Sequence, residues 1–241
     1  MPKLDVTLVR SEQIASATWA FTLGLAGQAF PFRAGQAIDL TFPAPPYHDA
    51  AGNRRAFSLA GAPGADRLLV ATRVRESAFK RSLVEAPQGT RLEIEGPFGS
   101  FTLPQRATSV VMLAGGVGVM PFRAMVEDAI ARDLEHSLLL IHSNRTAEEA
   151  PFLEELQQWS RASRRFAYQP TMTQPSLSPM AWTGERRRVG AELLADLLPT
   201  DRGNSTYYVA GPDRFVKGAI EALATLKVDE DHIRVEEFPG Y

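Results

Sequence analysis

The chain of 241 residues contains no cysteine. Structural disulfides, thiolate zinc sites and iron–sulfur clusters held by cysteine are therefore excluded. Histidine is also scarce, and the four copies, His48, His136, His142 and His232, show no spacing typical of metal ligands. His142 falls on a predicted buried strand, so we interpret it as an ordinary core residue. Walker-type phosphate loops and nucleophile-elbow serines are missing as well.

Long apolar runs and an excess of one charge are also lacking. No segment reaches the length of a transmembrane helix, and no signal-peptide pattern opens the chain, so we expect a cytoplasmic protein without membrane insertion. The formal net charge is −2. Residues 1–104 carry 11 Lys and Arg against 9 Asp and Glu, and residues 105–241 carry 15 against 19. Neither part has the basic excess of a nucleic-acid-binding protein, and no nucleic-acid partner is expected.

The first hundred residues alternate apolar and polar side chains in short segments separated by turn residues. This period of two predicts β-strands, and one helix is expected near residues 77–85. The expected strands are 4–9, 18–25, 36–42, 55–60, 68–75 and 90–95. Six short strands and a helix predict a closed or nearly closed antiparallel β-barrel.

After Pro104 the pattern changes to buried strands that alternate with helices. We expect strands at 109–113, 137–142, 166–172, 206–210 and 233–238, with helices at 119–132, 148–159, 191–198 and 214–226. This order predicts a doubly wound α/β domain around a mostly parallel sheet. Residues 174–188, which include three consecutive arginines, are expected to form a surface loop.

Two glycine-containing junctions of the second domain are candidates for nucleotide binding. The sequence AGGVG, residues 114–118, follows a buried strand and opens a helix in which Pro121 suits the first turn. Glycines there let backbone N–H groups approach a pyrophosphate at the positive end of a helix. The spacing differs from G-x-G-x-x-G, so a tight turn without a ligand is an equal alternative. VAGPD, residues 209–213, is a second strand-to-helix junction, and alone it is better interpreted as a simple helix start.

RAFS, residues 55–58, lies on a predicted barrel strand. Alternation directs Arg55 and Phe57 to one side of the strand and Ser58 to the other. An arginine can neutralise a phosphate, and an aromatic ring can cover a flat heterocycle. The alternative is an edge strand with one surface arginine and one core phenylalanine.

The helix at 77–85 has an unusual charge pattern at its start. Ser77 is the expected N-cap, and Lys80 and Arg81 follow in the first turn, where cations oppose the helix dipole unless an anion is bound. We interpret this conflict as a phosphate site, with a solvated Lys80 as the alternative.

Together with GPFGSF at 96–101 and EEFPGY at 236–241, these motifs resemble the ferredoxin–NADP reductase superfamily, in this order and over essentially the whole chain. The resemblance implies a flavin-binding barrel at residues 1–104 and an NAD(P)-binding domain at 105–241. It implies an FAD-dependent oxidoreductase that transfers hydride between NAD(P)H and flavin N5. Its electrons would pass to or from a separate one-electron carrier, namely a ferredoxin, a flavodoxin or an oxygenase component.

The resemblance also assigns roles in the barrel. RAFS is similar to the R-x-[YF]-[ST] flavin motif, which places Arg55 on the flavin phosphates, Phe57 on the isoalloxazine and Ser58 near N5. Lys80 stands where the family often has Ser or Thr, and FAD is favoured over FMN. The implied catalytic residues are Ser58, Glu237 and Phe238. The implied flavin-binding residues are Arg55, Ala56, Phe57, Ser58, Thr72, Val74, Ser77, Ala78, Phe79, Lys80 and Tyr241.

In the second domain, AGGVGVMP is similar to the family's GGxGxxP loop, with Val117 in place of the common Thr. Ala210 stands where the family often has Cys beside the nicotinamide. Arg145 could meet a ribose 2′-phosphate, and no acidic residue ends its strand, so NADPH is favoured over NADH. The implied NAD(P)-binding residues are Gly115, Gly116, Val117, Gly118, Pro121, Ser143, Asn144, Arg145, Ala210, Gly211 and Pro212.

Two other interpretations remain at this point. The departures at Val117 and Ala210 fit a flavin- or nucleotide-binding electron-transfer subunit without turnover of its own. An α/β transferase with a β accessory domain is a third possibility, but it would make RAFS and EEFPGY coincidences.

Overall fold

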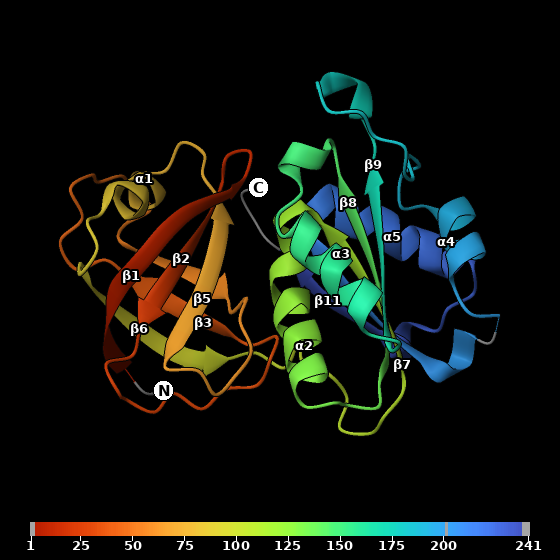
Figure 1. Cartoon of the computed structure of the whole chain (residues 1–241), viewed down its shortest axis with the longest axis horizontal. Coiled ribbons are helices and arrows are strands. Elements are labelled where there is room, and N and C mark those ends of the chain that lie inside the picture. The colour runs from red at the N-terminus through yellow and green to blue at the C-terminus, as the bar shows by residue number, and fades with distance from the viewer. Residues whose placement is uncertain (1–2, 201, 238–241) are drawn as a thin grey trace.

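The computed structural model describes residues 3–200 and 202–237. Two domains lie side by side, a β-barrel and a wound α/β domain (Figure 1). The barrel contains β1 (Lys3–Ala15), β2 (Thr18–Gly24), β3 (Ala37–Thr41), β4 (Arg54–Ser58), β5 (Arg67–Arg73), α1 (Ala78–Glu85) and β6 (Arg91–Phe98). This confirms the predicted six strands and single helix.

The barrel sheet is antiparallel, with the strand order β4-β3-β6-β1-β2-β5. Its two edge strands approach each other just beyond β4, where Leu59 pairs with Val70 and the Ala60 N–H donates to the Leu69 carbonyl over 2.8 Å. These contacts nearly close the barrel, as expected. Alternating apolar side chains fill its interior, among them Phe21, Ile38, Leu40, Leu68 and Leu92.

Strand β1 is longer than predicted. Residues 10–15 continue the pairing with β2, from Arg10 opposite Thr22 to Ala15 opposite Thr18. This part of the strand is polar and half-exposed, and its pairing with β2 shifts register between Gln13 and Ala15. The period of two that marks residues 4–9 is therefore weak there.

The second domain is built on five parallel strands in the order β11-β10-β7-β8-β9. The elements are β7 (Ser109–Gly115), α2 (Met120–Ala131), β8 (Ser137–Asn144), α3 (Leu153–Ala162), β9 (Phe166–Met172), α4 (Ala191–Leu197), β10 (Ser205–Gly211), α5 (Asp213–Thr225) and β11 (Ile233–Glu237). The chain winds outward from β7 in both directions, so the switch point of the topology lies between β7 and β10.

Helices cover both faces of this sheet. α2 and α3 pack on one face, and α4 and α5 on the other (Figure 1). α3 starts five residues later than predicted, because Pro151 follows an extended Ala150 and residues 147–149 form only a short 3-10 turn. None of the helices within residues 3–200 and 202–237 is long and apolar enough to cross a membrane.

One hydrophobic core runs from the barrel into the wound domain. Phe101, in the GPFGSF segment, packs against Phe122 of α2 and edge-on against Tyr208 of β10, with ring centroids 5.6 and 5.1 Å away. The Tyr208 hydroxyl donates to the Thr102 carbonyl over 2.7 Å. GPFGSF therefore lies beside the domain interface, as the resemblance implied.

A buried arginine of α2 joins the two domains more directly. Arg123 donates to the Ala60 carbonyl of the barrel over 2.6 Å and forms two 2.7 Å hydrogen bonds with Glu155 of α3. Its guanidinium also lies over the rings of Phe152 and Trp159. Losing one partner of this buried network would leave a charge unpaired, which is costly. Arg123 therefore helps to hold α2 against the barrel.

Candidate active site

A cavity of about 430 Å³ opens where β4 and α1 of the barrel meet β11 of the wound domain. We call it the seam cavity, and its volume is typical of sites for small molecules. Apolar walls come from Ala37, Ala56, Phe57 and Phe98. The polar lining consists of Asp49, Arg55, Ser58, Glu76, Ser77, Lys80, Glu236 and Glu237, and the loop residue Ala51 completes the wall.

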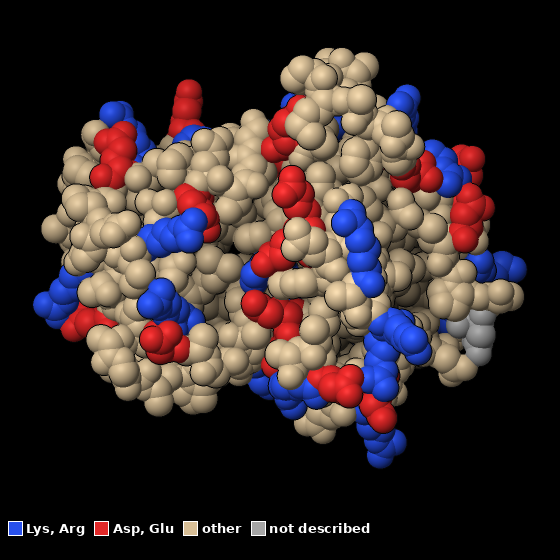
Figure 2. Space-filling model, viewed as in Figure 1, with Lys and Arg blue, Asp and Glu red and all other residues tan. Residues whose placement is uncertain are grey.

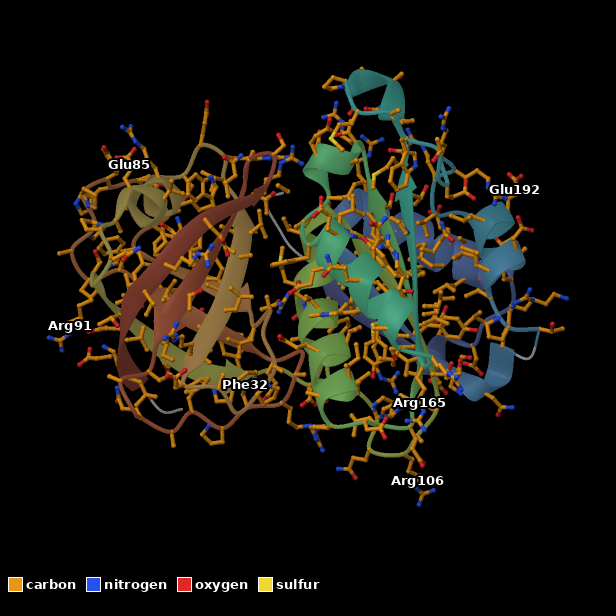
Figure 3. The ribbon with its side chains drawn as sticks, viewed as in Figure 1. Phe32, Glu85, Arg91, Arg106, Arg165 and Glu192 are labelled. Carbon is orange, nitrogen blue, oxygen red and sulfur yellow. The ribbon has the colours of Figure 1, made fainter. Side chains whose placement is uncertain are left out.

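A larger hollow of about 520 Å³ lies elsewhere along the domain boundary and includes Phe32 and His136 in its lining. Figure 3 shows Phe32 and Glu85, the last residue of α1, at opposite ends of the barrel. Among the predicted site residues that the structure describes, none lines that hollow.

Cations gather at one end of the seam cavity. The Lys80 ammonium donates to the Arg73 carbonyl over 3.0 Å, and burial, together with the like charges of Arg55 and Arg75, lowers the pKa of Lys80 to about 8. An anion placed there would relieve both the desolvation and the repulsion. The conflict noted in the sequence therefore has a counterpart in three dimensions.

The start of α1 is capped as predicted, but a second residue takes part. The Ser77 hydroxyl accepts from the Lys80 N–H over 3.4 Å. The Asp49 carboxylate accepts from the N–H groups of Ala78 and Ala51 over 2.8 and 3.0 Å and lies 3.6 Å from the Arg55 guanidinium. These contacts, led by the Ala78 N–H, lower the pKa of Asp49. Asp49 belongs to an irregular loop, and no motif in the sequence indicated it.

A carboxyl–hydroxyl pair stands at the opposite end of the cavity. The Ser58 hydroxyl donates to the Glu236 carboxylate over 3.3 Å, so that one domain contacts the other. Burial raises the pKa of Glu236 to about 7, against the smaller opposing effect of the Ser58 hydrogen bond. The resemblance pointed to Glu237, which also lines the cavity, but it missed its neighbour.

The reason lies in the strand register. β11 pairs with β10 so that Ala210 lies opposite Glu236 and Gly211 opposite Glu237. Alternation along β11 then turns only one of the two glutamates toward Ser58. A pair of adjacent glutamates carries no signal of this register. Phe238 and Tyr241, assigned to the same segment, lie outside the described residues.

Two aromatic residues of the predicted flavin set, Phe57 and Phe79, are buried. Phe57 lines the cavity, but it is only 4% exposed. Its ring packs in the barrel core against that of Phe79, with the two ring centroids 6.2 Å apart. Phe79 is 1% exposed, because it lies on the inner face of α1. Phe98, which was not predicted, presents a further aromatic side chain to the cavity.

The remaining members of the set lie outside this lining. Thr72 is fully buried in β5, and the Val74 N–H donates to the Ala17 carbonyl over 2.7 Å. The Ala78 N–H is engaged by Asp49. Flavin contacts stay predictions for every member of the set; six of them, namely Arg55, Ala56, Phe57, Ser58, Ser77 and Lys80, come together around one cavity.

The two glycine loops of the wound domain meet at the switch point. A Cβ on Gly118 would lie 2.2 Å from the Ala210 carbonyl oxygen, and Gly211, at φ +155°, packs against Gly115. Pro121 lies in the first turn of α2, as predicted. Only glycine permits this approach of the two backbones, so the loops form one continuous edge at the carboxyl ends of β7 and β10.

His142 of β8 supports this edge through a hydrogen bond to the loop residue Gly116. Its Nε2 lies 2.9 Å from the Gly116 carbonyl, which can only accept, so Nε2 carries the proton and Nδ1 accepts from the Tyr168 hydroxyl over 2.9 Å. Complete burial lowers the pKa of His142 to about 4, so the ring stays neutral at physiological pH. The prediction of a satisfied core histidine is confirmed.

The end of β8 carries the residues assigned to the adenosine ribose. Asn144 is buried and its side-chain Nδ2 has no hydrogen-bond partner, while Arg145 is largely exposed and donates to Gln174 over 3.0 Å. Glu149 folds back to within 3.8 Å of Arg145, although the sequence suggested no acid at this strand end. The Glu149 carboxylate is also paired with Arg73 of the barrel at 3.2 Å.

The residues present fit a flavin in the seam cavity. The cations Arg55 and Lys80 at one end suit phosphate, apolar walls suit a flat ring, and a hydroxyl–carboxyl pair lies at the other end. Within the described part of the chain, no group of three acidic or histidine side chains is placed to hold a metal ion. Figure 2 shows basic and acidic side chains interspersed over one face of both domains.

Comparison with known proteins finds relatives over most of the chain. Residues 112–221 match the model of the oxidoreductase NAD-binding domain. A ferredoxin–NADP reductase of Sorangium cellulosum is 31% identical over 220 residues, which are 88% of this chain and 87% of that protein. The reductase subunit of an aromatic O-demethylase from an Amycolatopsis species is 26% identical, and the match covers 98% of this chain and 69% of that protein.

Solved structures share the fold. The ferredoxin–NADP⁺ reductase of Neisseria gonorrhoeae, with FAD and NADP bound, superposes with a TM-score of 0.79 at 21% identity, covering 98% of this chain and 99% of that one. A cytochrome P450 reductase from Amycolatopsis gives a TM-score of 0.80 at 23% identity, covering 98% of this chain and 70% of that one.

Proposed function

The chain belongs to the ferredoxin–NADP reductase family of NAD(P)H-dependent oxidoreductases, and we propose that it binds FAD in the seam cavity and NADPH at the glycine loops. The observation that carries this proposal is the contiguity of the two sites. β10 and β11 set Ala210, on the glycine edge, beside Glu236, whose carboxylate contacts Ser58 inside the cavity. A nicotinamide on the loops and a ring in the cavity would therefore meet there.

Each end of the cavity has its own task. Arg55 and Lys80 would hold the phosphates, and Ala56, Phe57 and Phe98 would enclose the ring. FAD is proposed over FMN because of the family resemblance, and the neisserial reductase of the same fold carries FAD. NADPH is proposed because Arg145 is largely exposed at the end of β8, where a 2′-phosphate would lie.

Bound flavin would supply the redox chemistry, by accepting two electrons from a nicotinamide and releasing them singly to a carrier. The protein's residues contribute positioning and proton handling. The loops and the cavity bring the two reactants to one edge, which removes much of the entropic cost of their encounter. Ser58 and Glu236 hold a proton at that edge, and a carboxyl with a pKa about 7 can both take and release it at neutral pH.

The electron acceptor is proposed to be a separate protein, either a ferredoxin, a flavodoxin or an oxygenase component. The relatives that support this are a ferredoxin–NADP reductase and the reductase subunit of an O-demethylase. These 241 residues contain no cysteine, so any cysteine-held iron–sulfur cluster that takes part lies outside them.

The test is an anaerobic titration of the FAD-reconstituted protein with NADPH and, separately, with NADH. We expect the visible absorbance of bound flavin to bleach with either nucleotide and at lower concentrations of NADPH. Bleaching within seconds of stopped-flow mixing would exclude a passive binding subunit. A protein that retains no added flavin would contradict the proposal.

A further inference from the structure

We propose that the Asp49 carboxylate occupies the position where the flavin phosphates would bind. Asp49 would thereby set how tightly and how selectively the cavity binds phosphorylated flavins. This inference rests on the proposed flavin binding. It concerns a residue to which the family motifs give no role.

The contacts of Asp49 are those that a bound phosphate would make. One carboxylate oxygen accepts from the Ala78 N–H at the start of α1, and the other accepts from the Ala51 N–H. The Arg55 guanidinium lies 3.6 Å away. Helix N-terminal N–H groups and arginine are the ligands that proteins use for phosphate. Asp49 thus already occupies the anion site that the sequence of α1 predicts.

Arg55 is engaged by the same loop. Its Nη1 donates to the carbonyls of Ala51, Gly52 and Arg54 over 2.8, 3.0 and 2.7 Å. The segment that begins at Asp49 therefore supplies both the anion and the acceptors that satisfy the guanidinium. A phosphate can reach Arg55 and the Ala78 N–H only if Asp49 leaves them, or if two anions share the site.

Either course weakens binding of phosphorylated ligands. Two like charges a few ångströms apart at a partly exposed site repel each other, and displacement of Asp49 breaks its charge-assisted hydrogen bonds. We expect the net penalty to be about tenfold in dissociation constant. A flavin without phosphate would not meet it, so Asp49 lowers the selectivity of the cavity for FAD and FMN over riboflavin.

The experiment compares the full-length apo protein with its Asp49→Asn variant. Binding of FAD, FMN and riboflavin is followed by the quenching of flavin fluorescence, which requires no turnover. We expect FAD and FMN to bind about tenfold more tightly to the variant, with riboflavin changed less than twofold. Asp49→Ser is the second variant should the first fail to fold, and thermal unfolding monitors both.

Two control variants distinguish the effect of Asp49 at the phosphate position from the general effect of removing one negative charge. Asp39→Asn removes the same charge from β3, where Asp39 pairs with Arg54 outside the cavity. Glu76→Gln removes a carboxylate that lines the cavity and does not cap α1. Both should change FAD affinity less than threefold.

Three results would overturn the inference. Unchanged or weaker FAD binding by both Asp49 variants would make Asp49 a scaffold for α1. An equal gain in FAD affinity in the control variants would mean that Asp49 acts only through its negative charge. An equal gain in riboflavin affinity would mean that the effect of Asp49 does not depend on the phosphate. Failure of the parent and of every variant to bind any flavin would instead refute the proposed function, and this inference with it.

Discussion

The two binding regions are organised by different forces. The glycine edge of the wound domain is shaped by backbone contact, with Gly118 against Ala210 and Gly211 against Gly115. The seam cavity is shaped by charged side chains, and Asp49 and the loop carbonyls already satisfy the cation Arg55. One site is preorganised by geometry, and the other is held by interactions that a ligand must replace.

This contrast has an experimental consequence. The nucleotide edge should respond strongly to added side-chain volume and weakly to salt. The seam cavity should respond to single charges, and its affinity for phosphorylated flavins should fall as ionic strength rises.

The largest effect is expected from Gly118→Ala, because the new Cβ would clash with backbone that cannot move aside. We expect a loss of roughly 3 kcal/mol in stability and of roughly 100-fold in kcat/KM for NADPH. Thermal unfolding and steady-state reduction of ferricyanide measure these changes. Gly218→Ala is the control: a Cβ there meets open space in α5, so stability should rise by about 0.5–1 kcal/mol. A functional Gly118→Ala enzyme would show that the close approach is dispensable.

Glu236→Gln tests the carboxyl at the seam. Its pKa is raised in the folded protein, so the native state binds the extra proton, and this stabilising effect is present below about pH 4.5 and lost as pH rises through about 7. The free energy of unfolding of the variant should therefore match that of the parent near pH 5 and exceed it by roughly 2 kcal/mol at pH 8. Denaturant unfolding at both pH values measures this difference. A difference in stability that stays constant across pH would contradict the buried state of Glu236.

Arg55→Met should weaken FAD binding by about 30-fold while leaving riboflavin nearly unchanged, because a phosphate contact of this kind contributes about 2 kcal/mol. Fluorescence titration of the apo protein measures both ligands. Arg54→Met is the matched control, since Arg54 lies on the same strand but pairs with Asp39 and Glu95 outside the cavity. FAD affinity retained by Arg55→Met would remove the basis of the proposed orientation.

The smallest effect is expected at the end of β8. Arg145→Ala should lower kcat/KM for NADPH by about tenfold and leave NADH unchanged, since it removes one charge-assisted contact with a 2′-phosphate. The ratio of the two constants is the readout. Arg161→Ala, in the last turn of α3, should leave the ratio as it is. Equal losses with both nucleotides would assign Arg145 to the common part of the dinucleotide.

The sequence predicted the architecture well, because strands and helices leave periodic patterns. A phosphate site at Lys80, in the first turn of α1 where local propensity disfavours a cation, stays a prediction. The details that failed depend on tertiary register. The pairing of Glu236 with Ala210, and the folding of Glu149 onto Arg145, are set by contacts between elements that no local pattern encodes.

Asp49 illustrates the same limit more sharply. It lies in a loop between β3 and β4 with no regular periodicity, and only the folded chain brings it to the N–H of Ala78, 29 residues away. Phe79 is a milder case, since the helical pattern of α1 shows which side chains share a face but leaves open whether a ligand or the core covers it.

The buried guanidinium of Arg123 also bears on how the enzyme would be loaded. Parting the barrel from the sheet would break the hydrogen bond from Arg123 to the Ala60 carbonyl, whereas its contacts with Glu155 and with the rings of Phe152 and Trp159 lie within the wound domain. Separation of the two domains at each turnover is therefore disfavoured, because it would leave the buried guanidinium without one of its hydrogen-bond acceptors. We therefore expect NADPH to reach the glycine edge while the interface between the two domains stays closed.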